Sequence, residues 1–425
     1  MNNSYGTAAD IDSGYAWLRL LAAALIGTIG NVGMWSVVVV LPAVQADFGV
    51  DRATASLPYT LTLLGFGFGG VIAGRIADRH GVMLPVMGGA IAIGLGYVAS
   101  AYTQSLWQFA IAYGLLIGLC GTATIFAPLL ADMTHWFNKR RGIAVGICAS
   151  GNYLSGTIWP PILQAGIDTY GWRLTHIAVG IFCTVSLLLL APLLQRRPPP
   201  PTPAAAANVG HEPSPALVGL SSSTLQTLLV VAGLACCVAM SMPQVHIVAY
   251  CADLGFGAQR GAEMLSIMLG FGVVSRIASG FISDKIGGLA TVLAGSALQA
   301  VALVLYMPFD GLASLYVVSA LFGLFQGGIV PAYALVVREL FPSSEAGTRV
   351  GIVIMSTLFG MALGGWMSGA IFDFTGSYQA AFLNGVIWNL LNVAIILFLL
   401  LRRRNRTIPP APPRRAPGPE QFARA

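Results

Sequence analysis

Charge is scarce in this chain. Only 9% of its 425 residues are charged and 56% are hydrophobic, whereas a soluble domain carries roughly 25% charged residues. Because so few charges cannot cover a surface in water, we expect the lipid bilayer to be the solvent. The net charge is +6, but the bases lie between apolar runs and in the C-terminal tail. We therefore expect no nucleic acid partner.

Recognisable metal and catalytic motifs are also lacking. The six cysteines lie in or beside apolar runs, and none forms a CxxC motif or a Cys/His ligand spacing. We therefore expect no disulfide, metal or cofactor. No nucleophile–base pair is recognisable, so an enzyme is not expected. The N-terminal segment has no basic region before its apolar run and no clear cleavage site, so we expect that run to be retained as a span.

Long apolar runs are what the chain has instead. Twelve of them are long enough for helices of about 20 residues that cross a membrane. They are 15–44, 54–76, 83–102, 106–132, 142–166, 174–194, 223–251, 262–282, 288–308, 311–337, 348–372 and 378–401. A Pro/Ala-rich segment at 195–222 separates six runs from six, and we expect it to be a cytoplasmic linker. Residues 1–14 form a short N-terminus and 402–425 a basic tail. The sequence therefore predicts an all-α membrane protein.

The two halves resemble each other. GRIADRHG begins at Gly74 and GFISDKIG at Gly280, 206 positions later. ADFG at 46–49 returns at the same spacing as ADLG at 252–255. Three further residues return 205 positions later: Gly146, Asp168 and Gly171 as Gly351, Asp373 and Gly376. One register over so many markers indicates a duplicated unit. We therefore expect two six-helix bundles related by a pseudo-two-fold axis.

Basic residues predict the orientation. Most of them fall on one side of the expected spans: Arg75, Arg79, Lys139, Arg140, Arg141, Arg196, Arg197, Lys285, Arg338 and Arg402–Arg404. The other side carries little more than Arg52, Arg173 and Arg260. Cytoplasmic loops are enriched in Lys and Arg, so both termini are expected in the cytoplasm. The short loops are typical of a bacterial inner membrane protein.

Short strings carry a family resemblance. The Gly74 string, with Gly74, Asp78, Arg79 and Gly81, resembles the loop signature of the major facilitator superfamily. WFNKRRGIAVG at 136–146, followed by ASG at 149–151, resembles the span-five signature of monocarboxylate transporters. DSGYAW at 12–17 is similar to the signature before their first span, and FDFTGSY at 372–378 extends the resemblance. It implies the superfamily fold and a monocarboxylate substrate.

The duplicated string suggests a cytoplasmic gate. An aspartate at the end of a helix can cap it or pair with a base, and the glycines allow a tight turn. Such a pair could hold the two halves together on the cytoplasmic side and break as they move, or it could be a static clasp. The expected gate residues are Gly74, Asp78, Arg79 and Gly81, their counterparts Asp284 and Lys285, and the anchoring bases Lys139, Arg140 and Arg141.

Arg276 is the permanently charged residue expected deep within a span. It precedes Asp284 by eight residues, roughly 12 Å along a helix, inside a half-core of about 15 Å. An arginine there costs about 2.5–3.5 kcal/mol. Its counterpart in the first half is Gly70, and we expect no Asp or Glu inside any span to neutralise it. The missing anion is then the substrate. The alternative is an arginine satisfied by backbone carbonyls or reaching the cytoplasmic surface.

Other polar residues in the spans are candidates for the substrate path. His246, whose counterpart is Val40, could bind a proton or a ligand, or be a structural histidine. Each of the rest could orient a ligand or join helices: Asn31, Tyr59, Asn152, Tyr153, Gln326 and Tyr333. Well-studied animal monocarboxylate transporters carry a lysine in the first span and an aspartate where this chain has Gly272. Neither is present, so proton coupling stays open.

The preferred hypothesis is a secondary active transporter of a small organic monocarboxylate, such as a lactate- or pyruvate-like anion, with a monomer as its functional unit. Two bundles would rock about a central site that contains Arg276, with or without proton symport. Alternatives are antiport of another organic anion, export of an apolar or cationic compound, and a membrane sensor that binds without transport. Export of a cation would require an acidic residue in the spans.

Overall fold

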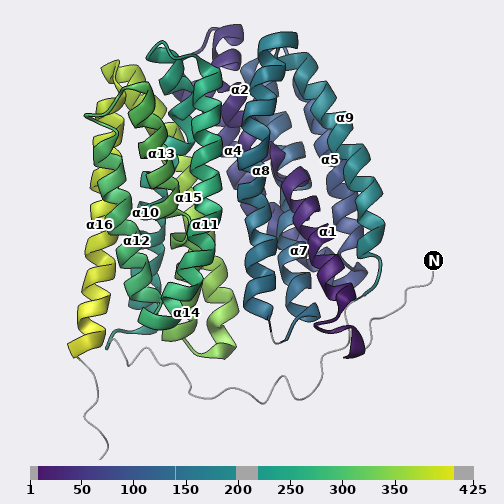
Figure 1. Ribbon diagram of the computed structural model, residues 1–425, viewed down its shortest axis with the longest axis vertical. Helices are drawn as coiled ribbons and strands as arrows, with labels where there is room; N and C mark the ends of the chain where they lie inside the picture. Colours follow the sequence, from purple (N-terminus) through teal and green to yellow (C-terminus); the bar gives the residue numbers. More distant parts are fainter. Residues whose placement is uncertain (1–7, 139, 198–218, 406–425) are drawn as a thin grey trace, which may run out of the picture.

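The computed structural model describes residues 8–138, 140–197 and 219–405, and every element in these residues is a helix. Two bundles lie side by side, the first half of the chain in purple to blue and the second in green to yellow (Figure 1). The first contains η1 (Ala8–Asp10), α1 (Gly14–Gly30), α2 (Val32–Phe48), α3 (Arg52–Ala55), α4 (Leu57–His80), α5 (Met83–Ala101), α6 (Leu106–Ile111), the π-helix η2 (Ala112–Thr122), α7 (Ala123–Trp136), α8 (Arg141–Tyr170), α9 (Trp172–Leu190) and η3 (Ala191–Leu194). The second contains α10 (Ser222–Asp253), α11 (Ala258–Ile286), α12 (Gly288–Leu305), α13 (Leu312–Gln326), α14 (Ile329–Leu340), α15 (Ser343–Thr375) and α16 (Tyr378–Asn405).

Eleven helical segments of the described residues are long and apolar enough to cross a membrane. They correspond to the expected spans except the fifth, which is α8. This helix is 30 residues long, but its Ser, Asn, Gln, Gly and Pro residues make it less apolar. It packs against α1 and α2 of its own bundle and against α11 of the other, so part of its surface faces protein rather than lipid. The all-α membrane fold is confirmed, and α8 completes twelve crossing segments.

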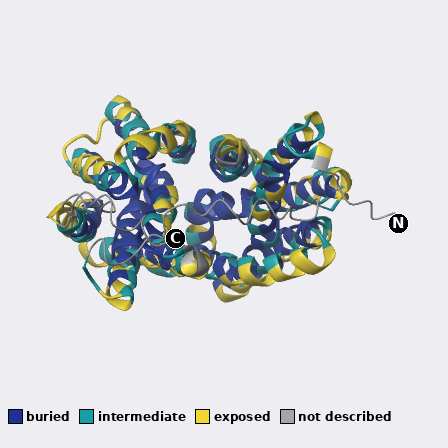
Figure 2. Ribbon diagram, turned by 90° about the horizontal axis from the view of Figure 1, so that it is seen from below, coloured by how far each residue is buried: buried dark blue, intermediate teal, exposed yellow. Residues whose placement is uncertain are grey.

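The outer surface is apolar. Large hydrophobic side chains are more than half exposed on several helices, for example Leu21 at 58%, Leu189 at 74% and Ile387 at 60%. Figure 2 shows exposed residues on the outside of both bundles and buried residues inside each bundle and where the two meet. So many exposed apolar side chains are unusual for a soluble monomer. They are the expected surface of helices that face hydrocarbon.

The sequence repeat is visible in the backbone. Gly81 ends α4 with φ 86° and ψ 163°, and its counterpart Gly287 ends α11 with φ 82° and ψ 162°. Positive φ favours glycine because a side chain would clash with the backbone. The other two pairs of markers, Gly49 with Gly255 and Gly171 with Gly376, also have positive φ. Gly81 and Gly287 therefore end equivalent helices in the same conformation, and the other two pairs share only the sign of φ.

The two ends of the molecule differ. We call the end where α1 begins and α16 ends the terminal face, and the other end the opposite face (Figure 1). At the opposite face α3 packs against α15. Nearer mid-height, Phe68 of α4 lies beside Phe359 of α15, with ring centroids 6.3 Å apart.

Several glycines near the terminal face have open space beside them. A Cβ atom added at Gly74, Gly146, Gly280 or Gly351 would meet no atom within 4 Å. These glycines lie on helices of both bundles, toward the terminal face. The contacts of α3 with α15 and of Phe68 with Phe359 therefore join the bundles at the opposite face and near mid-height, whereas these four glycines have open space beside them.

A break between α13 and α14 lies close to α11. A Cβ atom on Gly327 would lie 2.4 Å from the Gly272 carbonyl oxygen, so the two helices can approach only without a side chain here. The N–H of Gly328 donates to Ser275 Oγ at 3.1 Å, which satisfies a backbone donor at the break. This close packing brings the Gly327 carbonyl next to the middle of α11.

Candidate substrate site at the bundle interface

Arg276 lies between the bundles. Its Nη1 donates to the Ala149 carbonyl on α8 at 3.0 Å, and its Nε donates to the Gly327 carbonyl at 3.3 Å. The guanidinium carbon lies 3.8 Å from the centroid of the Tyr153 ring on α8. Ala149 and Tyr153 belong to the first bundle, whereas Arg276 and Gly327 belong to the second. The charge is therefore positioned at the interface between the two bundles.

The hydrogen bonds of Arg276 leave it with free capacity. A guanidinium has five N–H donors, and within the described chain two of them donate to carbonyl oxygens. No Asp or Glu of the described residues forms a salt bridge with it. The alternative stated in the sequence analysis, an arginine satisfied by backbone carbonyls, therefore holds for two of the five donors. Two neutral carbonyls do not neutralise a cation, so an anion can still be bound.

Tyr153 links Arg276 to other polar groups. Its hydroxyl donates to Gln326 Oε1 at 3.1 Å. Gln326 is fully buried, and its Nε2 has no partner among the described residues. The Tyr59 hydroxyl on α4, in a residue that is 1% exposed, likewise has no partner among the described residues. An unpaired buried donor costs about 1–3 kcal/mol, so these groups are well placed to bind a polar ligand.

Asn31 and Asn152 instead join helices of the first bundle. Asn152 Nδ2 donates to Asn31 Oδ1 at 3.2 Å, and Asn31 Nδ2 donates to the Gly27 carbonyl at 2.6 Å. The main-chain oxygen of Asn152 accepts from Trp35 Nε1 at 2.9 Å. Both asparagines are buried and hold α1, α2 and α8 together. They position the helix that carries Ala149 and Tyr153.

His246 and Tyr333 also have partners within the second bundle. His246 Nε2 lies 2.8 Å from the Gly365 carbonyl and Nδ1 lies 3.4 Å from the Tyr378 hydroxyl. Tyr333 donates to Asn392 Oδ1 at 2.5 Å. Neither residue contacts Arg276. The structure brings together Arg276, Tyr153 and Gln326, and His246 and Tyr333 are bonded to other partners.

The predicted gate residues face solvent. Asp78 and Arg79 in the first half and Asp284 and Lys285 in the second are exposed, and none forms a salt bridge among the described residues. Lys139 lies outside the described residues and the side chain of Arg141 is likewise not described. Arg140 lies with its guanidinium carbon 5.9 Å from the centroid of the Trp17 ring. A gate formed by these residues therefore stays a prediction.

One expectation is wrong at Asp132. We expected no carboxylate inside a span, but Asp132 on α7 is 6% exposed and binds Arg19 of α1, which is 1% exposed. Nε of Arg19 donates to Oδ2 at 2.7 Å and Nη2 donates to Oδ1 at 3.1 Å. Each residue lies at the end of an expected span, where a charge can reach water, so the sequence offered no signal that they meet. Both belong to the first bundle, and Arg276 gains no counter-charge from them.

The two strings before the first and fifth spans meet beside this ion pair. The N–H of Asp12 donates to the Trp136 carbonyl at 3.0 Å, and the Tyr15 and Trp136 ring centroids are 5.3 Å apart. Trp136 also packs its ring 4.6 Å from the Arg19 guanidinium carbon. Some of the residues that carry the family resemblance therefore stabilise this end of the first bundle through packing and hydrogen bonds.

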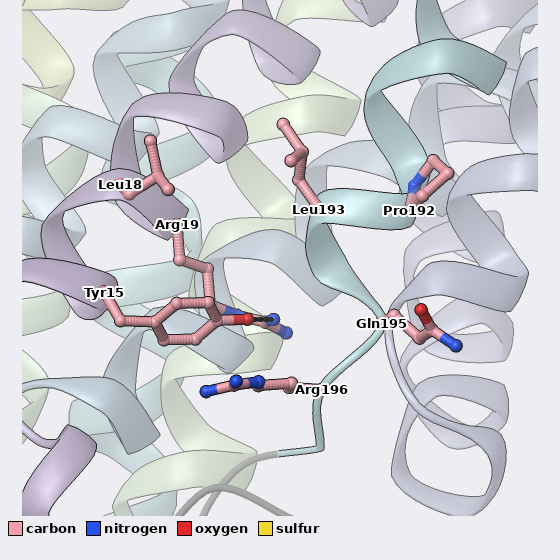
Figure 3. A pocket seen from close by; sticks show the side chains of 7 residues that line it. All are labelled: Tyr15, Leu18, Arg19, Pro192, Leu193, Gln195 and Arg196. Carbon is pink, nitrogen blue, oxygen red and sulfur yellow. Dashed lines mark hydrogen bonds between the residues drawn. The ribbon is translucent and has the colours of Figure 1, made fainter. Parts of the chain in front are cut away.

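A hollow of about 220 Å³ lies at the same end. Figure 3 shows the side chains that line it, which come from α1, from η3 and from the two residues after it: Tyr15, Leu18, Arg19, Pro192, Leu193, Gln195 and Arg196. All of them belong to the first bundle. Arg19 is paired with Asp132, and Arg196 stacks on Tyr15 with 4.7 Å between the guanidinium carbon and the ring centroid. The hollow is thus separate from the bundle interface around Arg276.

A contact that the sequence did not predict closes the opposite face. Arg52 was expected as a loop residue, but it is only 7% exposed. Its Nη1 donates to Asp253 at 2.8 Å and to the Tyr378 hydroxyl at 2.5 Å. Asp373 accepts the main-chain N–H groups of Arg52 at 2.9 Å and of Ala53 at 2.6 Å. Asp253 and Asp373 are both repeat markers, but their sequence positions predicted no partner for either.

Comparison with known proteins identifies the architecture. The family model described as Major Facilitator Superfamily matches residues 23–314 and 280–424. The chain belongs to the Major Facilitator Superfamily. The fold agrees: a bacterial homolog to the human lysosomal transporter Spinster has a TM-score of 0.66 at 16% identity, with 92% of this chain and 96% of that chain covered. The peptide transporter POT has a TM-score of 0.65 at 16% identity, covering 91% and 94%.

Members of the superfamily that are similar in sequence include monocarboxylate transporters. Monocarboxylate transporter 13 of Bos taurus is 28% identical over 386 residues, 87% of this chain and 86% of that protein. Monocarboxylate transporter 11 of Mus musculus is 29% identical over 394 residues, covering 88% and 84%. The MFS-type transporter opdF of Penicillium oxalicum is 26% identical over 307 residues, covering 71% and 69%. The expected resemblance is confirmed, and these relatives are superfamily transporters rather than enzymes.

Proposed function

We propose that this transporter carries a small organic monocarboxylate of the lactate or pyruvate kind by alternating access, with Arg276 as the anion site. The observation that carries the proposal is a guanidinium between the bundles, with three unused N–H donors and no carboxylate partner in the described chain. A carboxylate can accept two parallel N–H bonds from one guanidinium. A single site cation favours a single negative charge on the substrate.

The surrounding groups would define the rest of the ligand. The Gln326 amide and the Tyr59 hydroxyl are buried and unpaired in the described chain, so they can hydrogen-bond a second oxygen such as a hydroxyl or keto group. The Tyr153 ring holds the guanidinium from one side. Binding would thus involve α4 and α8 of one bundle and α11 and α13 of the other. A ligand shared by both bundles is what alternating access requires.

The membrane orientation forms part of the proposal. With the terminal face in the cytoplasm, the exposed bases of α4 and α11 lie on the positive side. We place the chain in a bacterial inner membrane as a functional monomer. Proton symport is compatible with this scheme, and antiport of an organic anion or efflux of another compound is the alternative.

Uptake into proteoliposomes tests the proposal. Purified protein is reconstituted, and initial rates are measured for radiolabelled lactate and pyruvate, a dicarboxylate and an organic cation. We expect saturable uptake of the monocarboxylates, and its loss in Arg276→Ala. Arg260→Ala is the matched control, since Arg260 lies on the same helix in an exposed i,i+3 pair with Glu263. Equal monocarboxylate rates for Arg276→Ala and the parent protein would refute the anion site, and uptake of the cation alone would favour the alternative.

A further inference from the structure

An ion pair inside the first bundle has an altered counterpart in the second. Asp47 and Arg173, both of the first bundle, form a salt bridge of 2.6 Å. Their repeat counterparts are Asp253, 206 positions later, and Tyr378, 205 positions later. The second half thus retains the aspartate and has a tyrosine in place of the arginine. The missing guanidinium is supplied by Arg52 of the first bundle, which binds both Asp253 and Tyr378. We call Arg52, Asp253 and Tyr378 the interbundle clamp.

His246 is bonded to this clamp. It is fully buried, and its two ring nitrogens face the Gly365 carbonyl at 2.8 Å and the Tyr378 hydroxyl at 3.4 Å. Since a carbonyl can only accept, Nε2 carries a proton and Nδ1 of the neutral ring is the acceptor. The Tyr378 hydroxyl then donates to Nδ1, and its oxygen accepts from Arg52. With neutral His246 each bond therefore has one donor and one acceptor: Arg52 donates to Tyr378, Tyr378 donates to Nδ1, and Nε2 donates to the Gly365 carbonyl.

A second proton on His246 does not fit. It would sit on Nδ1 and point at the Tyr378 oxygen, to which Arg52 already donates from 2.5 Å. The Tyr378 hydroxyl hydrogen would have to turn away, and two cations would converge on one phenol oxygen. Like charges at such a distance repel strongly in a buried site. The protonated histidine and the seated Arg52 thus compete for the same acceptor.

The charges around His246 do not offset this competition. On its own helix α10, Asp253 is engaged by Arg52. α15 presents the Gly365 carbonyl, and its Asp373 is occupied by the backbone of residues 52 and 53. α16 contributes Tyr378 and α3 contributes Arg52. The charges of the neighbouring helices α2 and α11 near this face are paired elsewhere, Asp47 with Arg173 and Glu263 with Arg260.

We propose that His246 is a proton-binding site whose occupancy opposes the interbundle clamp, so that acid releases the opposite face. In the closed state the ring is neutral. When Arg52 withdraws, Nδ1 can take a proton from water and the Tyr378 oxygen accepts it in a hydrogen bond. Reseating Arg52 favours release of that proton. By linkage, each event weakens the other by the same factor. The inference rests on the proposed alternating access and gives that cycle a site for pH control.

Distance measurements without substrate test the inference. Spin labels are placed at Tyr102→Cys and Phe309→Cys, one on each bundle at the opposite face. Five of the six native cysteines are buried, and labelling of the chain without the added cysteines measures the background from Cys120. Distances in nanodiscs are compared at about pH 5.5 and about pH 8, on either side of the usual histidine titration. We expect the ratio of open to closed molecules to rise about tenfold in acid, which is the effect of a tenfold change in proton affinity.

Three variants separate the possible outcomes. His246→Gln, which can still donate to the Gly365 carbonyl, is expected to stay closed at both pH values, and Arg52→Ala to be open at both. Arg173→Ala, which breaks the equivalent pair inside the first bundle, is the matched control and should keep the tenfold response. A parent protein without a pH response, or His246→Gln with the parent's response, would overturn the inference. Because no substrate is added, these results stand whether or not monocarboxylate uptake is found.

Discussion

Asp132→Asn is expected to destabilise the protein strongly, because it leaves the Arg19 charge buried without a counter-ion. The pair is bidentate, with bonds of 2.7 and 3.1 Å, and the two residues are 1% and 6% exposed. Breaking a buried pair by removing one partner costs about 3–5 kcal/mol. For a folding unit the size of this bundle, each kcal/mol lowers Tm by about 2–4 °C. The predicted loss is therefore roughly 10 °C.

Thermal unfolding in detergent, followed by tryptophan fluorescence, measures this effect. The double variant Arg19→Met/Asp132→Leu should recover most of the loss, because apolar side chains often replace a buried ion pair without large cost. Asp47→Asn is the control, since its pair with Arg173 is about 40% exposed and such pairs contribute at most about 1 kcal/mol. Equal Tm values for Asp132→Asn and Asp47→Asn would refute the reasoning.

The remaining predictions concern the interface around Arg276. Each is measured as the rate of monocarboxylate uptake, normalised to the amount of folded protein. Tyr153→Phe keeps the ring over Arg276 but loses one hydrogen bond, so we expect about a fivefold loss, the effect of about 1 kcal/mol, whereas Tyr153→Leu should lose considerably more. Gly272→Asp and Gly272→Ala should both lower uptake, because a Cβ atom there would lie 2.8 Å from the Tyr153 ring; a larger loss in Gly272→Asp than in Gly272→Ala would measure the added effect of a carboxylate on Arg276. Gly327→Ala should lower Tm and uptake together, since its Cβ would lie 2.4 Å from the Gly272 carbonyl, and an unchanged protein would show that the break can relax.

The architecture could be predicted because it depends on local patterns. Apolar length predicts spans, and the register shared by Gly81 and Gly287 predicts two equivalent units. α8 shows where the pattern weakens: this helix packs against both bundles and so needs fewer apolar side chains. Repetition also pointed to Arg276 and His246 as departures from the common scaffold, since their counterparts are Gly70 and Val40.

Partner choice could not be predicted in the same way. Arg52 and Asp253 are 201 positions apart and meet only because the bundles pack at the opposite face. Arg19 and Asp132 lie at the ends of spans, where the sequence alone is equally consistent with exposure to water. Tyr333 was a candidate for the substrate path, yet a short bond to Asn392 holds it within the second bundle. Each outcome depends on tertiary contacts that no local pattern encodes.

Three arginines show how the position of a partner relates to the role of a charge. Arg19 finds its carboxylate within one bundle, so the pair is kept however the bundles move, and its effect is on stability. Arg52 finds its carboxylate in the other bundle, so that bond must break when the opposite face opens. Arg276 contacts both bundles through carbonyl oxygens and has no carboxylate in the described chain. Under the proposed function, a bound anion would be a counter-charge that moves with the interface, and the occupancy of Arg276 would then link substrate to conformation.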